Sequence, residues 1–243
     1  MNTAVVTGTS YGIGKSITNA LLRQSWKVYG LSRSKPDFEH INFVWLQCDL
    51  SVPTQIKTCL ANIPEPTIDA LVSNAGTIAI EMASNVTEKS YADTFSVNVL
   101  APMLLVHELT NKISKATIIS ISSVSDRMPE ADIALYCSSK AANTSYFNSL
   151  AHELKDAKVF AILPDYVDTP MLHGTMDSDT SFDWAKTIKS DDIAALCTDL
   201  IDGKRTLGSG SNVIIVTEAL KGDLQSVQKL YSFNTDTNLL DIL

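Results

Sequence analysis

Short apolar runs recur along the chain and are separated by segments of helical length. The seven runs cover residues 4–7, 27–31, 43–47, 70–73, 117–121, 159–163 and 212–216. Each run is continuously apolar, as expected of strands that are buried on both faces. Because parallel strands are joined by right-handed helical crossovers, the pattern predicts an α/β fold. We expect a doubly wound, mostly parallel seven-stranded sheet with helices on both faces.

The length of 243 residues fits a single domain of this kind over residues 1–243. The chain has no internal repeat and no low-complexity linker that would divide it. The segment 165–190 is too long for a routine connection and carries several large apolar side chains, so we expect a partly helical substrate lid there. Residues 221–231 have a helical pattern, and we expect 221–243 to form a C-terminal helix and a tail.

Charge and residue spacing argue against several classes of function. The formal net charge of -8 repels polyanions, so we expect no nucleic-acid partner. The cysteines and histidines are scattered without the spacing of a metal site, so we expect no metal. No apolar run reaches membrane-spanning length, and the first strand begins too close to Met1 to leave room for a signal peptide. We therefore expect a cytoplasmic protein with no membrane partner.

A glycine-rich turn joins the first predicted strand to a helical pattern over 15–23. The turn reads Thr7-Gly8-Thr9-Ser10-Tyr11-Gly12-Ile13-Gly14. Gly8 permits a tight turn, Gly12 lets backbone N–H groups approach a pyrophosphate, and Gly14 lets the helix pack closely on the strand. This context predicts a Rossmann-type dinucleotide site. The expected cofactor-binding residues of the turn are Gly8, Ser10, Tyr11, Gly12, Ile13 and Gly14.

The end of the second predicted strand bears on which dinucleotide binds. It reads Leu31-Ser32-Arg33-Ser34-Lys35. An acid at this point would hold the ribose hydroxyls of NAD, whereas an arginine suits the 2′-phosphate of NADP. Arg33 can form a forked pair with phosphate and Lys35 can add charge, while Ser32 offers no carboxylate to repel it. The sequence therefore favours NADP over NAD, with Asp37 as a competing acid further along the loop.

A tyrosine and a lysine four residues apart carry the strongest chemical signal. Tyr136 and Lys140 would share one face of a helix, and Ser123 follows the fifth strand. We expect the Lys140 ammonium to lower the pKa of the Tyr136 phenol, which would then serve as an acid–base group near neutral pH. Ser123 is placed to hydrogen-bond a substrate oxygen on which negative charge develops during hydride transfer.

These motifs together resemble those of the short-chain dehydrogenase/reductase family, in its single-domain branch. The likeness covers nearly the whole chain and rests on the glycine turn, the Asn74-Ala75-Gly76 triplet, Asn98, Ser123, Tyr136 and Lys140, in the family's order. The resemblance implies that Tyr136 is the acid–base group and that Lys140 holds the nicotinamide ribose. It further implies that Ser123 orients the carbonyl and that Asn98 supports a water-mediated proton relay.

The resemblance also implies further cofactor contacts, although the chain departs from the family's pattern at Ser73, at Asp165 and at Thr217-Glu218-Ala219. Asp49 resembles the residue that contacts the adenine, and Thr169 the residue that holds the nicotinamide carboxamide. The expected cofactor set beyond the turn is Arg33, Asp49, Leu50, Asn74, Ala75, Gly76, Tyr136, Lys140, Pro164, Val167 and Thr169. Asp165 stands where the family has glycine, so we expect the loop there to differ in shape and its carboxylate to lie near the substrate.

The sequence thus predicts an enzyme that transfers a hydride between NADP(H) and a neutral carbonyl or alcohol. A cofactor-binding sensor or scaffold without turnover is the alternative, although it has no chemical need for Ser123, Tyr136 and Lys140 together. A sugar-nucleotide epimerase or dehydratase would need an added substrate domain, which 243 residues hardly accommodate. Related enzymes often pair through helices that correspond to about 98–113 and 135–154, so we expect a homodimer or homotetramer.

Two segments are expected to border the substrate pocket, 124–135 and 165–190. Their apolar side chains predict an apolar wall, and their acids predict exclusion of anionic substrates. The expected wall residues are Met128, Met171, Leu172, Met176, Phe182 and Trp184, and the expected acids are Glu130, Asp165 and Asp168.

Overall fold

The computed structural model describes residues 1–176, 180–217, 231–234 and 239–242. Its centre is a seven-stranded sheet in the order β3-β2-β1-β4-β5-β6-β9, in which every neighbouring pair is parallel. The strands are β1 (Thr3–Thr7), β2 (Lys27–Ser32), β3 (Phe43–Gln47), β4 (Ala70–Ser73), β5 (Thr117–Ile121), β6 (Lys158–Pro164) and β9 (Ser211–Ile215). The predicted sheet is confirmed, and each predicted run lies in its own strand to within one residue at either end.

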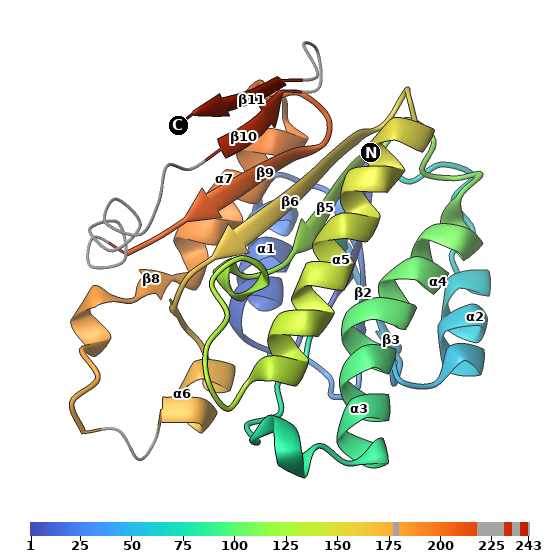
Figure 1. Cartoon of the computed structure of the whole chain (residues 1–243). Helices are drawn as coiled ribbons and strands as arrows, with labels where there is room; N and C mark the ends of the chain where they lie inside the picture. Colours follow the sequence, from blue (N-terminus) through green and yellow to red (C-terminus); the bar gives the residue numbers. More distant parts are fainter. Residues whose placement is uncertain (177–179, 218–230, 235–238, 243) are drawn as a thin grey trace.

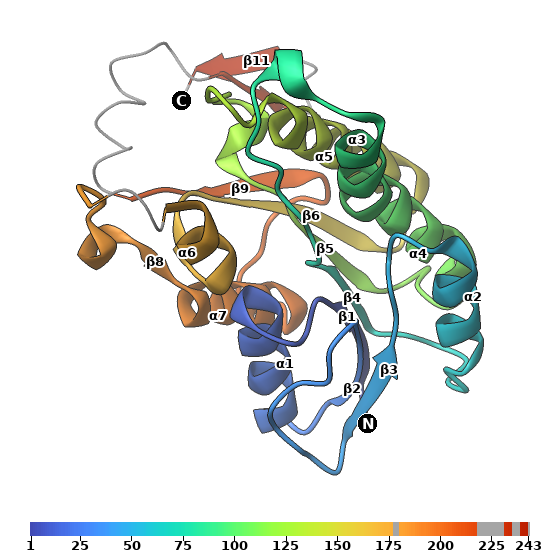
Figure 2. The ribbon, with the colours of Figure 1, turned by 90° about the horizontal axis from the view of Figure 1, so that it is seen from below.

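Helices cover both faces of this sheet (Figures 1 and 2). On one face lie α1 (Gly12–Arg23) and α7 (Ser190–Ile201); on the other lie α2 (Pro53–Ala61), α3 (Glu88–Phe95), α4 (Ala101–Leu109) and α5 (Ala134–Glu153). Two cores result, one around Ile17, Leu21 and Ile193 and one around Leu105 and Phe147. The inner strands, such as β1, β4 and β5, are buried on both faces, which accounts for their continuously apolar sequences, whereas the edge strands β3 and β9 are only partly buried.

The strand order reverses at β1, which has β2 on one side and β4 on the other. In such a sheet the carboxyl ends of the strands leave a crevice at the reversal point, where ligands bind. The arrowheads of β6 and β9 in Figure 1 point towards the side of the molecule that carries α6 (Pro170–Met176). The same side therefore holds the crevice and the expected lid.

The segment 165–190 is partly helical in its described part, as predicted. It contains β7 (Val167–Asp168), α6, the 3₁₀ turn η4 (Trp184–Lys186) and β8 (Ile188–Lys189). The strands β7 and β8 pair in parallel outside the main sheet, so the two ends of the segment lie side by side. The sequence pattern does not reveal this pair, because each strand has only two residues.

In the C-terminal part of the chain, β10 (Tyr231–Asn234) pairs antiparallel with β11 (Leu239–Ile242) at the edge of the molecule in Figure 1. The helix predicted for 221–231 lies outside the described residues except for Tyr231, which is in β10. Among the helices that the structure describes, none combines the length and the apolar character needed to cross a membrane.

Candidate active site

A cleft of about 450 Å³ opens at the carboxyl ends of the sheet strands. Residues of the glycine turn, the ends of β2 and β3, the segment after β4, and the start of the 165–190 segment line it together with Ser123, Tyr136 and Lys140. All of the expected cofactor-binding and catalytic residues line this cleft except Gly14 and Asn98. The fold therefore gathers one site from positions that are far apart in the sequence.

The glycine turn is locked to the segment that follows β4. The Thr7 hydroxyl oxygen accepts hydrogen bonds from the backbone N–H groups of Asn74 and Ala75, each at 3.0 Å, and Asn74 Nδ2 donates to the Thr7 carbonyl at 2.9 Å. Gly8 has a φ of +72°, which favours glycine. A Cβ on Gly14 would lie 2.2 Å from the Gly8 carbonyl oxygen, so Gly14 acts by close packing and does not line the cleft.

The start of α1 is suited to an anion. Tyr11 is the N-cap residue, and its side chain makes no capping hydrogen bond. The first turn of α1 also carries no acid, so within the described residues no carboxylate on the helix caps its free N–H groups. These N–H groups and the positive end of the helix dipole face the cleft, where they favour a phosphate. The chain's own residues thus fit the pyrophosphate of a dinucleotide.

Arg33, which directly follows β2 and is exposed, lines the cleft. Asp37, the competing acid, pairs with Lys15 at 2.6 Å and does not line the cleft. Lys35 pairs with Glu39 at 3.2 Å and does not line it either, so the added charge expected from Lys35 stays a prediction. The side chain of Arg33 forms no ion pair among the described residues.

Asp49 lines the cleft near Arg33, but its carboxylate is already engaged, and its expected contact with the adenine stays a prediction. Its Oδ1 accepts hydrogen bonds from the backbone N–H and the hydroxyl of Ser51 at 2.9 and 2.7 Å. These hydrogen bonds hold the pKa of Asp49 below its ordinary value, and the charge of Arg33 adds to the effect. Asp49 therefore stays ionised and shapes the turn after β3.

Tyr136 and Lys140 lie one turn apart on α5, and Ser123 faces them from the turn after β5. Lys140 Nζ lies 5.6 Å from the centre of the Tyr136 ring and donates a hydrogen bond to the Ile121 carbonyl at 3.0 Å. Ser123 is the N-cap of η3 (Val124–Asp126), and its hydroxyl oxygen accepts from the Ser125 N–H at 3.2 Å. The three polar groups thus meet at one end of the cleft.

Burial dominates the electrostatics of this group. It raises the pKa of Tyr136 to about 12, although a hydrogen bond from Ser123 opposes the rise. Burial lowers the pKa of Lys140 to about 8, while the charge of Asp126 acts in the opposite direction. The prediction that Lys140 lowers the pKa of Tyr136 is wrong for this structure, because the ammonium is bonded to a carbonyl and burial outweighs its field.

Asn98 lies behind the cleft rather than in its lining, and its expected support of a water-mediated proton relay stays a prediction. It is in a π-helical turn, η2 (Ser96–Leu100), and is 2% exposed. Its Oδ1 accepts from the Thr77 N–H at 2.8 Å, and its Nδ2 donates to the Thr77 carbonyl at 2.8 Å. The Asn98 backbone carbonyl accepts from Asn143 Nδ2 at 2.8 Å. Asn98 therefore fixes Thr77, which does line the cleft.

The expected apolar wall is only partly present. Met171 and Leu172 line the cleft, but the other four predicted wall residues, Met128, Met176, Phe182 and Trp184, do not. Phe182 and Trp184 instead pack edge to face with ring centres 4.8 Å apart. Of the expected acids, Glu130 and Asp168 lie outside the lining, because their carboxylates bind Tyr166 in one case and His173 and Lys189 in the other.

Asp165 lines the cleft, but its carboxylate is held by the end of the neighbouring strand. Its Oδ2 accepts hydrogen bonds from the Thr217 hydroxyl at 2.9 Å and from the Thr217 N–H at 3.3 Å. Its backbone does not adopt a positive φ. The Asp165 side chain therefore links the segment that follows β6 to the segment that follows β9, a contact that glycine could not make.

Several lining residues were not anticipated from the sequence. Cys48 directly follows β3, so the rule that ligands lie at the carboxyl ends of strands could have found it. Thr77 and Ile78 extend the predicted Asn74–Gly76 segment. Asp93 and Val97 reach the cleft from α3 and η2, and no sequence motif marks them.

Comparison with known proteins agrees with this geometry. Residues 2–179 match the family model of the short chain dehydrogenases. The benzil reductase ((S)-benzoin forming) of Bacillus subtilis is 27% identical over 186 residues, which cover 70% of this chain and 76% of that protein. A solved short chain dehydrogenase family protein from Francisella tularensis has a TM-score of 0.83 at 23% identity, covering 89% of this chain and 97% of that one. A 4-hydroxyisoleucine dehydrogenase solved with NADH has a TM-score of 0.78 at 25% identity, covering 89% and 97%.

Proposed function

This chain belongs to the short-chain dehydrogenase/reductase family, and from that membership we propose that it reduces neutral carbonyl compounds with NADPH, or oxidises the corresponding alcohols. The observation that carries the proposal is the meeting of Ser123, Tyr136 and Lys140 with the glycine turn in one cleft. A protein that only sensed or stored a dinucleotide would have no use for these three side chains together.

Each side chain has a distinct role in the proposed reaction. A bound nicotinamide supplies or accepts the hydride. The Tyr136 hydroxyl, whose pKa of about 12 keeps it protonated at neutral pH, donates its proton to the substrate oxygen in the reductive direction. Ser123 donates a hydrogen bond to the same oxygen, and Lys140 would hold the ribose of a bound nicotinamide nucleotide.

The assignment of Tyr136 is tested by Tyr136→Phe. We expect turnover of any accepted carbonyl to fall by at least about a thousandfold, because the variant loses the proton donor. Binding of NADPH, followed by its fluorescence, should change by less than about twofold, since the phenyl ring keeps the packing. Steady-state turnover and fluorescence titration of both proteins measure these effects. Turnover close to that of the wild type would refute the role, and a wild type that binds NADPH without turnover would favour the sensor alternative.

We further propose NADP over NAD on the position of Arg33. Arg33 lines the cleft and forms no ion pair among the described residues; Asp37 pairs with Lys15, and Asp49, whose pKa the Arg33 charge helps to lower, is hydrogen-bonded to Ser51. Arg33→Ala should raise the KM for NADPH by roughly tenfold or more, as expected for loss of a bidentate phosphate contact, and leave the KM for NADH nearly unchanged. Lys35→Ala is the control, because Lys35 lies outside the cleft lining. A wild-type preference for NADH would contradict the proposal, and several structural relatives were solved with NADH.

For the substrate we propose a neutral, fairly apolar carbonyl compound. Met171 and Leu172 form an apolar part of the cleft wall, and the Asp165 carboxylate would repel anions. The similarity to an enzyme named benzil reductase is consistent with an apolar carbonyl. A turnover screen should rank aromatic and aliphatic ketones above their carboxylate-bearing analogues, and the reverse order would contradict the proposal.

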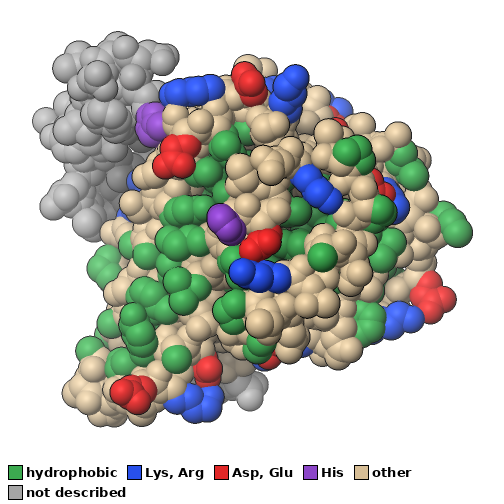
Figure 3. All heavy atoms as spheres, turned by 90° about the vertical axis from the view of Figure 1, so that its right-hand side faces the viewer, with side chains coloured by type: hydrophobic (Ala, Val, Ile, Leu, Met, Phe, Trp, Pro, Cys, Tyr) green, Lys and Arg blue, Asp and Glu red, His purple; other side chains and the backbone are tan. Residues whose placement is uncertain are grey.

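We also propose that the chain forms a homodimer or homotetramer. Hydrophobic side chains gather on part of one face of the molecule (Figure 3), and Leu100 and Tyr91 are 57% and 53% exposed. Light scattering should therefore give twice or four times the chain mass of 26.4 kDa, and a mass of 26.4 kDa would contradict the proposal.

The cytoplasmic location expected from the sequence stays a prediction.

A further inference from the structure

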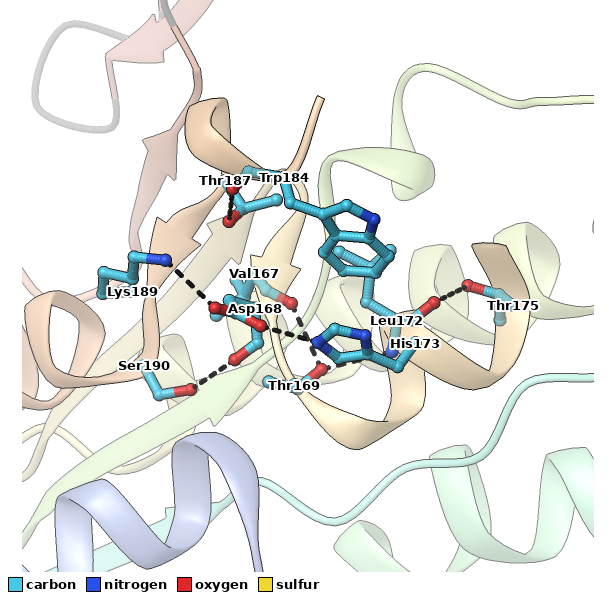
Figure 4. A network of polar contacts seen from close by, with 10 residues as sticks. All are labelled: Val167, Asp168, Thr169, Leu172, His173, Thr175, Trp184, Thr187, Lys189 and Ser190. Carbon is cyan, nitrogen blue, oxygen red and sulfur yellow. Dashed lines mark hydrogen bonds and ion pairs between the residues drawn. The ribbon is translucent and has the colours of Figure 1, made fainter. Parts of the chain in front are cut away.

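Within the segment 165–190, a cluster of polar and aromatic contacts joins β7, α6, η4 and β8, as Figure 4 shows. We call this cluster the clasp; it consists of Asp168, His173, Trp184, Lys189 and Ser190. Asp168 is its centre. Its Oδ1 lies 2.9 Å from His173 Nε2, its Oδ2 accepts from Lys189 Nζ at 3.0 Å, and its backbone carbonyl accepts from the Ser190 hydroxyl at 3.2 Å. One residue therefore joins β7, α6, β8 and the start of α7.

The aromatic part of the clasp connects α6 to the turn η4. The His173 ring stacks on Trp184 with ring centres 3.9 Å apart and planes only 5° from parallel. In Figure 4 the imidazole meets the Asp168 carboxylate at its edge and the indole of Trp184 at its face. His173 in α6 thus contacts both Asp168 in β7 and Trp184 in η4.

The inner side of α6 forms a wall of the active-site cleft. Met171, Leu172 and Thr175 line the cleft, while His173 between them points outward to the clasp. The helix has only seven residues, so it depends on tertiary contacts for its position. We propose that Asp168 is a positioning residue that fixes this wall from behind and thereby sets the affinity of the site for its carbonyl substrate. The inference rests on the function proposed above.

The clasp is not expected to add much to the stability of the whole protein. The side chains of His173, Lys189 and Asp168 are 57%, 58% and 35% exposed, and such ion pairs contribute little to the free energy of unfolding. A change at Asp168 should therefore affect the local position of α6 far more than the global fold. This difference separates a positioning role from a merely structural one.

The test compares Asp168→Asn with Asp183→Asn. Asp183 lies in the same segment, and among the described residues its carboxylate contacts the turn η4, through Lys186 at 3.0 Å and the Ala185 N–H, but neither β7 nor α6. We expect Asp168→Asn to raise the KM for the carbonyl about five- to tenfold, as expected for losing about 1 kcal/mol of positioning free energy, with kcat changed less than about twofold. The melting temperature should stay within about 2 °C, and Asp183→Asn should match the wild type.

A second pair of variants tests the same idea at His173. His173→Gln keeps a hydrogen-bond donor for the Asp168 carboxylate, so its KM for the carbonyl should rise only in part. His173→Ala removes the donor, so its KM should rise as much as in Asp168→Asn. An unchanged KM in Asp168→Asn, or an equal rise in Asp183→Asn, would overturn the proposal. If the wild type shows no turnover, the proposed function is refuted, but the positioning role of Asp168 can still be tested by limited proteolysis. Cleavage within 169–189 must be faster in Asp168→Asn than in Asp183→Asn, and equal rates would overturn the clasp.

Discussion

A buried lysine is costly for folding and useful for catalysis, and Lys140 illustrates both effects. Its pKa of about 8, against an ordinary value of 10.5, means that the folded protein disfavours the charged form. The difference corresponds to about 3 kcal/mol of lost stability at a pH below 8, where the lysine is protonated in both the folded and the unfolded chain. The penalty disappears as the pH rises from about 8 to above 10.5, because the folded protein releases its proton first.

Lys140→Met is therefore expected to stabilise the protein while abolishing turnover. The free energy of unfolding at pH 7 should rise by about 1–3 kcal/mol, since methionine fills the space without a buried charge. The gain should shrink towards zero near pH 10.5. Urea denaturation at both pH values measures it, with Lys155→Met, an exposed lysine, as the control. A variant that is destabilised at pH 7, or whose gain does not depend on pH, would contradict the electrostatic explanation.

Among the elements, the β1–α1 unit is the one whose geometry depends most on glycine. Gly14→Ala would place a Cβ 2.2 Å from the Gly8 carbonyl oxygen, a backbone atom that cannot give way without opening the turn. We expect a loss of at least about 2 kcal/mol in stability and at least a tenfold rise in the Kd for NADPH. Denaturation and fluorescence titration measure the two effects.

The matched control is Gly174→Ala, which also places a methyl group on a helical glycine. A Cβ there meets nothing within 4 Å, so this variant should be neutral or more stable by up to about 1 kcal/mol. Equal behaviour of the two alanine variants would show that close packing at Gly14 is not the reason for its glycine.

The elements of the sheet could be predicted from the sequence because burial on both faces leaves a direct pattern. The runs at β1, β4 and β5 are continuously buried, and no polar face interrupts them. The β7–β8 pair and the clasp could not be predicted, since they depend on where a loop returns in space. The pKa of Tyr136 was missed for a similar reason. Spacing places Lys140 nearby, but only the structure shows that its ammonium turns to the Ile121 carbonyl.

At the scale of the whole molecule, the site belongs to the sheet as a unit. Gly8, Asn74, Ser123 and Pro164 follow or end β1, β4, β5 and β6, and parallel pairing brings these ends to one edge. The topology explains why motifs spread over more than half of the chain converge, and why the candidate site could be predicted mainly from residues that follow strands. The exceptions are Tyr136 and Lys140 on α5 and Asn98 in the π-helical turn η2, which do not follow strands.

A ligand that bridges so many strand ends should stabilise the entire fold rather than one loop. With NADPH at 100 times its Kd, mass action adds about 2.7 kcal/mol to the free energy of unfolding. For a chain of this length the melting temperature should then rise by roughly 5–10 °C in a single cooperative transition. Differential scanning calorimetry measures the shift, and Tyr136→Phe should keep it, because that residue acts on the substrate oxygen. A rise confined to one of two separate transitions would mean that the strand ends do not respond as a unit to the bound nucleotide.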